Sequence, residues 1–161
     1  MIPFDNRDGW IWLDGAFVPW RDARLHICSH ALHYGSGVFE GERMYGGRIF
    51  ELGAHTRRLF KSAETLDFEI PFSEAEINAA CNEACARNGL QDCYVRPIAW
   101  RGAEQLSVSA LHTKTHVAIA VWEWPKYFDA AKLRRGIRLT WAKYRRPPAD
   151  ARAGAGRGGG L

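Results

Sequence analysis

The chain has 161 residues, of which 47% are hydrophobic and 12% aromatic, and a formal net charge of +4. This apolar content is enough for a folded core and argues against a disordered chain. Most of the charge lies at one end, because the segment from Tyr144 onward holds four arginines against one aspartate. The rest of the chain is close to neutral, so we expect no basic surface that binds nucleic acid.

Cysteine spacing and hydropathy limit the class of protein further. The four cysteines form no C-x-x-C pair and no dense disulfide framework. We interpret Cys81 and Cys85, which are four apart on an expected helix, as small apolar residues on one face. The N-terminus lacks the apolar stretch of a secretion signal, and no run approaches the ~20 apolar residues that span a bilayer. We therefore expect a soluble, cytoplasmic protein with no membrane partner.

The N-terminal part of the chain predicts two hairpins. Residues 10–13 and 16–20 are apolar and aromatic runs on either side of a D-G turn. Residues 38–45 and 48–52 repeat this arrangement around a G-G turn. Because such short turns join adjacent antiparallel strands, both hairpins point to an antiparallel sheet.

Two helices are predicted next. Apolar residues recur at helical spacing from about residue 55 to about residue 66. The second helix is expected at 74–87, where Ser73 and Glu76 have the spacing of a capping box. The Asn88-Gly89 pair that follows favours a left-handed helix stop.

Strands are predicted again at 93–100 and 116–124. The second run is the most apolar in the chain, so we expect it near the centre of the sheet. Pro97 interrupts the first run, which places that strand at an edge or a bulge, because proline cannot donate to a strand ladder. The segment 101–115 between them is polar and rich in small residues, as is typical of a mobile loop.

The C-terminal part changes in character. Residues 137–144 predict one last strand, whereas residues 147–161 have no apolar periodicity and predict an unstructured Arg/Gly/Ala tail. Such a tail could be a flexible end, or an Arg/Gly segment that binds RNA. The second interpretation is the weaker one, because no aromatic residue lies between the arginines to stack on bases.

One histidine cluster could in principle bind a metal. Cys28, His30 and His33 precede a Gly-rich turn, and thiolate and imidazole are both zinc ligands. No further pair of ligands completes four-coordination. We therefore interpret these residues as turn and packing residues and expect no metal site.

Other side chains predict a site for an amino acid. Arg58, on the first long helix, is either a solvated surface arginine or a bidentate partner for a phosphate. Tyr94 and Arg96 are two apart on a strand, so they point to one face and could bind a carboxylate together. Trp124 and Tyr127 would add an aromatic wall. Each residue alone is more often structural, but together they describe an apolar pocket with one carboxylate clamp.

The chain resembles the branched-chain amino-acid aminotransferases of fold type IV. The motifs that carry the resemblance cover roughly residues 8–147 and are H-A-L-H-Y-G-S-G-V-F-E-G-E-R at 30–43, H-T-R-R-L-F-K-S-A at 55–63, Y-V-R-P at 94–97, A-V-W-E-W-P-K-Y-F at 120–128 and Y-R-R-P at 144–147. The resemblance implies an α+β fold, the small N-terminal domain of that family, with an antiparallel or mixed sheet and two helices on one face. The implied divisions are a small domain at 1–126, an interdomain linker at 127–135, and a stub of the large domain at 136–146.

The resemblance also implies roles for the site residues. Arg58 would contact the phosphate of the cofactor pyridoxal 5′-phosphate (PLP). The substrate side-chain pocket would be lined by Phe39, Tyr94, Trp124 and Tyr127. Arg96, together with Tyr94, would bind substrate carboxylates.

Substrates and partners follow from the same resemblance. The reaction would transfer the amino group of leucine, isoleucine or valine to 2-oxoglutarate, so the ligands would be branched-chain amino acids and 2-oxo acids. Tyr34 and the loop near Ser107 and Val108 would project into the site of a partner subunit in a homo-oligomer.

One departure from the family concerns catalysis. After the Y-R-R-P motif the family continues to the lysine that carries PLP, whereas residues 147–161 contain no lysine. Arginine cannot replace that amine, because it stays protonated. We therefore expect a truncated or frame-disrupted copy with no catalytic residue of its own, inactive alone. The alternatives are a D-amino-acid aminotransferase or aminodeoxychorismate lyase of the same fold, and a non-catalytic dimerisation module.

Overall fold

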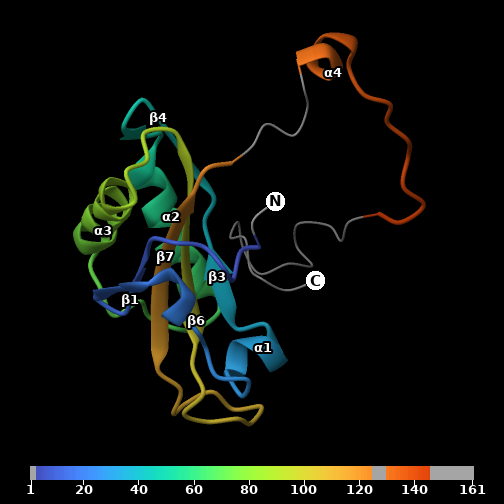
Figure 1. Ribbon diagram of the computed structural model, residues 1–161. Coiled ribbons are helices and arrows are strands. Elements are labelled where there is room, and N and C mark those ends of the chain that lie inside the picture. Colours follow the sequence, from blue (N-terminus) through green and yellow to red (C-terminus); the bar gives the residue numbers. More distant parts are fainter. Residues whose placement is uncertain (1–2, 125–129, 146–161) are drawn as a thin grey trace.

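The computed structural model describes residues 3–124 and 130–145. Its main feature is a sheet in which every described strand pair is antiparallel (Figure 1). The strands lie in the order β2-β1-β7-β6-β4-β5, and β3 also pairs with β6. The strands are β1 (Trp10–Leu13), β2 (Ala16–Pro19), β3 (Gly37–Phe39), β4 (Glu42–Tyr45), β5 (Arg48–Ile49), β6 (Cys93–Arg101) and β7 (Thr115–Trp122). The helices are η1 (Trp20–Asp22), α1 (His30–Tyr34), α2 (Leu52–Thr65), α3 (Glu74–Arg87) and α4 (Ala130–Arg135). The predicted α+β class is confirmed.

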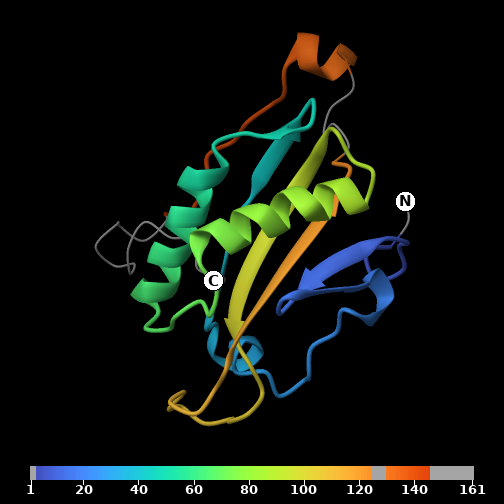
Figure 2. The ribbon, with the colours of Figure 1, turned by 90° about the vertical axis from the view of Figure 1, so that its left-hand side faces the viewer.

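The two long helices, α2 and α3, cover one face of this sheet (Figure 2). Leu59 of α2 and Ile77 of α3 are fully buried, and each such side chain contributes about 1.5–3 kcal/mol through removal of apolar surface from water. The sheet supplies the other half of the core through alternate residues such as Val95 and Ile119. The prediction of two helices on one face is therefore confirmed.

Local signals predicted α3 better than α2. The α3 helix has the predicted bounds, and Ser73 and Glu76 form the capping box. The α2 helix begins at Leu52, three residues before the predicted start near residue 55. Its N-cap is Glu51, which has a left-handed φ of 51° and makes no side-chain cap. The early start was missed because the sequence there contains no capping pattern.

The predicted strand at 38–45 is two strands. β3 and β4 pair with the same side of β6, and Glu40 and Gly41 separate them. The prediction that Pro97 marks an edge or a bulge was wrong, because β6 lies between β7 and the β3/β4 edge in unbroken register with β7. The Pro97 carbonyl accepts a 2.9 Å hydrogen bond from the backbone N of Glu40. The missing N–H of Pro97 therefore falls at the interruption between β3 and β4, where no ladder bond is lost.

C-terminal to the sheet, the prediction of a strand at 137–144 was wrong. These residues are irregular, and Leu139 and Trp141 are 86% and 97% exposed. An apolar run forms a strand only where a neighbouring edge is available.

Residues 125–129 and 146–161 lie outside the described residues, so the roles of Tyr127 and of the tail, and the domain limits at 126, 135 and 146, remain predictions.

None of the described helices combines the length and the apolar character that crossing a bilayer requires.

Candidate functional site

The second face of the sheet carries the predicted site residues. Along β6, the odd-numbered residues from Cys93 to Ala99 are buried against the helices, whereas Tyr94, Arg96, Ile98 and Trp100 point to the other side. The same alternation in β7 directs Ala118, Ala120 and Trp122 to that side. We call this side the open face, since α2 and α3 both lie on the opposite one.

Tyr94 and Arg96 meet on the open face, as predicted. The Nη2 atom of Arg96 donates a 2.7 Å hydrogen bond to the Tyr94 hydroxyl oxygen. A phenol oxygen that accepts this bond still has its own proton to donate. The Nε atom of Arg96 is buried and has no hydrogen-bond partner among the described residues. The pair therefore presents unsatisfied donors, which is the requirement of a carboxylate site.

Aromatic rings surround this pair. The Arg96 guanidinium carbon lies 4.2 Å from the centre of the Phe39 ring and 5.1 Å from that of Tyr94. The Tyr94 ring lies 4.7 Å from Trp124 and 4.9 Å from Trp122. Cation–π contacts of this kind hold the guanidinium plane and exclude water. The structure thus brings together Phe39, Tyr94, Arg96 and Trp124.

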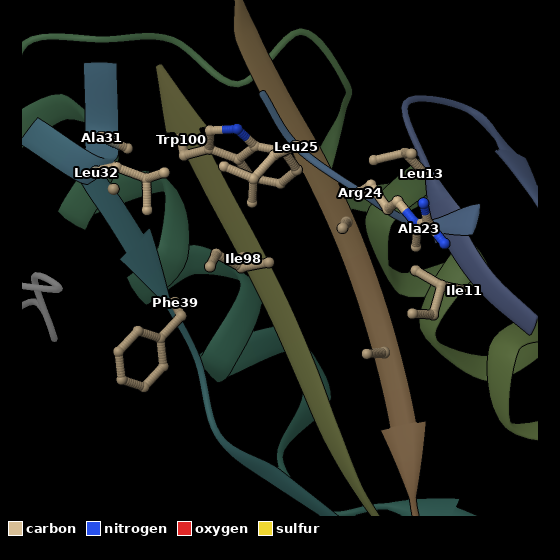
Figure 3. A pocket seen from close by; sticks show the side chains of 13 residues that line it. Ile11, Leu13, Ala23, Arg24, Leu25, Ala31, Leu32, Phe39, Ile98 and Trp100 are labelled. Carbon is tan, nitrogen blue, oxygen red and sulfur yellow. The ribbon is translucent and has the colours of Figure 1, made fainter. Parts of the chain in front are cut away.

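An apolar pocket of about 320 Å³ lies on the open face (Figure 3), and Phe39, whose ring contacts Arg96, is part of its lining. Its floor is made of small residues, Gly37, Ala118 and Ala120. In the figure, Phe39, Ile98, Trp100, Leu25 and Leu32 lie on one side of the pocket, and Ile11, Leu13 and Arg24 on the other. Ala120 is the cross-strand partner of Arg96. The Tyr94–Arg96 pair and an aliphatic pocket therefore adjoin.

Arg58 does not lie free on its helix. Its Nε and Nη2 atoms donate to the two carboxylate oxygens of Glu40 at 2.6 and 2.5 Å. The Nδ1 atom of His55 lies 2.9 Å from the same carboxylate. Burial acts to raise the pKa of Glu40, but the hydrogen bonds from Arg58 and His55 outweigh it and bring the pKa below its usual value. The interpretation of Arg58 as a merely solvated arginine is therefore wrong, although 42% of its side chain remains exposed.

A second buried carboxyl group has a different character. Glu42 is 1% exposed, and neither of its carboxyl oxygens has a hydrogen-bond partner among the described residues. Burial, assisted by the negative charge of Glu40, raises its pKa to about 8. Glu42 points toward the helices and not toward the open face, so it is a neutral core residue near neutral pH.

The histidine cluster is structural in the described part of the chain. His30 is buried, with Nδ1 2.6 Å from the Ser36 hydroxyl and Nε2 3.0 Å from the Ser107 carbonyl. His33 bonds to the Ile27 carbonyl through Nε2. No group of three or more His, Cys, Asp or Glu residues among residues 3–124 and 130–145 could hold a metal ion.

Tyr34 lies at the edge of the molecule beside the loop that follows β6. Its ring stacks on His30 at 4.5 Å and is 46% exposed. In the loop, Val108 and Leu111 are 86% and 84% exposed. The Arg101 guanidinium fastens this loop, since it donates to the carbonyls of Ala110 and Asp67.

Sequence reasoning missed three residues of the site. Glu40 holds Arg58, and Trp122 adds a ring and a buried indole N–H that has no partner among the described residues. Gly41 leaves room for the clamp, because a Cβ at this position would lie 2.2 Å from the Tyr94 hydroxyl. The available signal was the Glu-Gly pair directly after an apolar strand, where a charged residue has no ordinary structural reason to be.

This fold and site define a class of protein. A family model for amino-transferase class IV matches residues 37–155, so the chain belongs to the class IV aminotransferases, which are PLP-dependent transferases.

Within the class, the chain is similar to branched-chain-amino-acid aminotransferases. It is 45% identical over 145 residues to the enzyme of Pseudomonas aeruginosa, a match of 88% of this chain and 47% of that one. A crystal structure of the T.th. enzyme with pyridoxamine 5′-phosphate matches with a TM-score of 0.87 at 42% identity, over 95% of this chain and 52% of that one. The same enzyme complexed with 4-methylvaleric acid matches with a TM-score of 0.84 at 40% identity, over 95% and 50%. The chain spans about half the length of the curated relatives that it matches.

The side chains present fit the phosphate of such a cofactor. Glu40 occupies one edge of the Arg58 guanidinium, and 42% of the Arg58 side chain remains exposed, so this residue can still offer donors and charge to an anion. Arg58 and the Tyr94–Arg96 pair are linked through one short segment, because Arg58 binds Glu40 and the next residue, Gly41, abuts Tyr94.

Proposed function

We propose that the whole protein is a branched-chain amino-acid transaminase, which transfers the amino group of leucine, isoleucine or valine to 2-oxoglutarate. The observation that carries the proposal is the Tyr94–Arg96 clamp next to an aliphatic pocket. The similarity to branched-chain aminotransferases supports this substrate class and gives no support to the D-amino-acid or lyase alternatives.

The described residues would bind and orient both ligands. PLP supplies the electron sink of the reaction when it is bound. Arg58 would hold the cofactor phosphate through the part of its guanidinium that Glu40 leaves exposed. That contact would fix one end of the cofactor relative to the sheet, so that its reactive end faces the substrate.

Substrate recognition would use the clamp for the carboxylate and the pocket for the side chain. The Tyr94 hydroxyl and Arg96 would bind a carboxylate, and Arg96 would also reach the second carboxylate of 2-oxoglutarate. Phe39 and Trp124 would exclude water from that bond, and a branched side chain would pack against the apolar lining. Tyr127, which lies outside the described residues, would extend the same wall.

The catalytic amine would come from elsewhere. Among the described residues, the pocket lining contains no lysine, and Lys61 is bonded to Glu64 on the surface of α2. We propose accordingly that the 161-residue chain alone has no transaminase activity. Tyr34 and the loop near Ser107 and Val108 would serve the site of a partner subunit in a homo-oligomer.

The test of substrate binding uses the tryptophans of the site as reporters. The chain is titrated with 2-oxoglutarate and with 4-methyl-2-oxopentanoate while tryptophan fluorescence is recorded. We expect Arg96→Gln to weaken both affinities by about 10-fold or more, since a charge-assisted bond is lost. The control Arg87→Gln, on the exposed side of α3, should bind as the unmodified chain does. Equal affinities in Arg96→Gln and the unmodified chain would contradict the proposed clamp.

The test of activity is simpler. The chain is incubated with PLP, leucine and 2-oxoglutarate, and glutamate is measured against a sample without protein. We expect no glutamate above that background. Glutamate formation that survives repurification would mean that the chain contains its own amine, and would refute the second part of the proposal.

A further inference from the structure

We propose that Glu40 is a positioning residue for the cofactor phosphate: its buried carboxylate orients the Arg58 guanidinium that binds the phosphate. This inference rests on the phosphate contact of Arg58 in the proposed function. It adds a residue that makes no contact with substrate or cofactor and acts through another side chain.

The Glu40 carboxylate is itself held firmly. Glu40 lies in the interruption between β3 and β4, and its backbone N–H donates to the carbonyl of Pro97 in the centre of the sheet. The side chain is fully buried. Water therefore cannot compete for the carboxylate, and among the described residues the groups that satisfy it come from α2, namely Arg58 and His55.

The geometry of the bond determines what Arg58 can do. Glu40 takes both Nε and Nη2, which fixes the plane of the guanidinium as well as its position. A free arginine would lose its rotamer freedom when an anion binds, whereas this one has lost it on folding. The Nη1 atom makes no hydrogen bond to the described residues, and 42% of the Arg58 side chain is exposed, so this edge is free to bind an anion.

The negative charge of Glu40 acts in the opposite direction. A carboxylate beside Arg58 reduces the attraction of the guanidinium for a phosphate. Two features limit this cost: His55 also donates to the carboxylate, and the neighbouring carboxyl of Glu42 is uncharged near neutral pH. The cluster therefore adds one negative charge and not two, and it lies on the buried side of Arg58. We expect orientation to outweigh repulsion.

The experiment compares two amines that differ only in the phosphate. Dissociation constants of pyridoxamine 5′-phosphate and pyridoxamine are measured by equilibrium dialysis with the full chain; neither has an aldehyde that would react with surface lysines. Their ratio reports the phosphate contact alone. We expect Arg58→Ala to abolish the preference for the phosphate, and Glu40→Gln to reduce it by about 10-fold, the size typical of a lost supporting bond. Glu64→Gln, which breaks the exposed pair with Lys61 on the same helix, should leave the ratio unchanged.

A second variant guards against misfolding and separates orientation from charge. Glu40→Asp keeps the charge but shortens the side chain by one methylene, so it cannot reach Arg58 in the same geometry. Orientation predicts that this variant also loses phosphate preference, whereas repulsion alone predicts no change. An unchanged or increased ratio in Glu40→Gln and Glu40→Asp, together with a lowered ratio in Arg58→Ala, would overturn the inference and leave the proposed function intact. An unchanged ratio in Arg58→Ala, or no preference in the unmodified chain, would overturn both.

Discussion

The two faces of the sheet use the same strands for different purposes. On the covered face, Val95 and Ile119 are fully buried beneath α2 and α3. On the open face, the same two strands carry Arg96 and Trp122, each with a buried nitrogen that lacks a partner among the described residues. A folded chain keeps such unsatisfied donors only at a cost of about 1–3 kcal/mol each. Apart from Glu42, the covered face is thus made of apolar side chains that need no partner, whereas the open face holds buried donors that the described chain does not satisfy.

Glu42 is the exception on the covered face, and its removal should have the largest effect. Its pKa in the fold is about 8 against an ordinary value of 4.5. The unfolded chain loses this proton first, so the contribution of Glu42 to stability is fully present below pH 4.5 and is lost as pH rises toward 8, by about 5 kcal/mol in total. We expect Glu42→Val to remove this fall and to be the more stable protein at pH 8. Urea unfolding from pH 5 to 8 measures the effect; parallel pH profiles of the two proteins would disprove it.

A pair of substitutions on neighbouring residues of β7 compares the two faces directly. Ile119→Ala opens a cavity in the core and should lower the free energy of unfolding by about 2–5 kcal/mol. Ala120→Val lies on the open face and should change stability by about 0.5 kcal/mol or less. The same valine would reduce the pocket and weaken binding of 4-methyl-2-oxopentanoate. Urea unfolding and fluorescence titration of both variants provide the comparison, and a stability loss in Ala120→Val as large as in Ile119→Ala would remove the distinction between the faces.

A smaller loss of stability than that of Ile119→Ala is expected at the start of α3. Ser73→Ala removes the capping box and should lower the free energy of unfolding by about 1 kcal/mol without changing ligand affinity. The control is Thr65→Ala, whose hydroxyl bonds to a carbonyl of its own helix. Weaker binding of 2-oxo acids by Ser73→Ala would contradict this prediction, because it would mean that the cap also affects the open face.

Local patterns in the sequence predicted a large part of this fold. The capping box defined α3, the turn pairs defined both hairpins, and two-residue alternation placed Tyr94 and Arg96 on one face. Each of these inferences depends only on residues close together in the chain. Each is confirmed, except that the last predicted strand, 48–52, is shorter: β5 is Arg48–Ile49, and Leu52 already belongs to α2.

The remaining features depend on partners distant in the sequence. Arg58 looked like a surface residue until Glu40, eighteen positions earlier, was found beside it. Pro97 looked like an edge residue because the break between β3 and β4 that accommodates it lies in another strand. The strand predicted at 137–144 failed for the same reason, since the described part of the chain offers it no neighbouring edge for pairing. The hydrophobic periodicity of a segment indicates which secondary structure it favours, but its contacts with distant residues determine where it lies in the fold.

The bonds of Arg101 have a consequence for local opening of the chain. The loop at 102–114 carries exposed apolar side chains, and on that ground alone it would open and close freely. The Arg101 guanidinium donates both to the Ala110 carbonyl in the loop and to the carbonyl of Asp67, which lies just after α2. Local opening must therefore break charge-assisted bonds, so the hydrogen-bonded amides of this loop, such as those of Gly102 and Thr113, should exchange with deuterium more slowly than they do in Arg101→Gln, and the loop should resist proteases that cut extended segments.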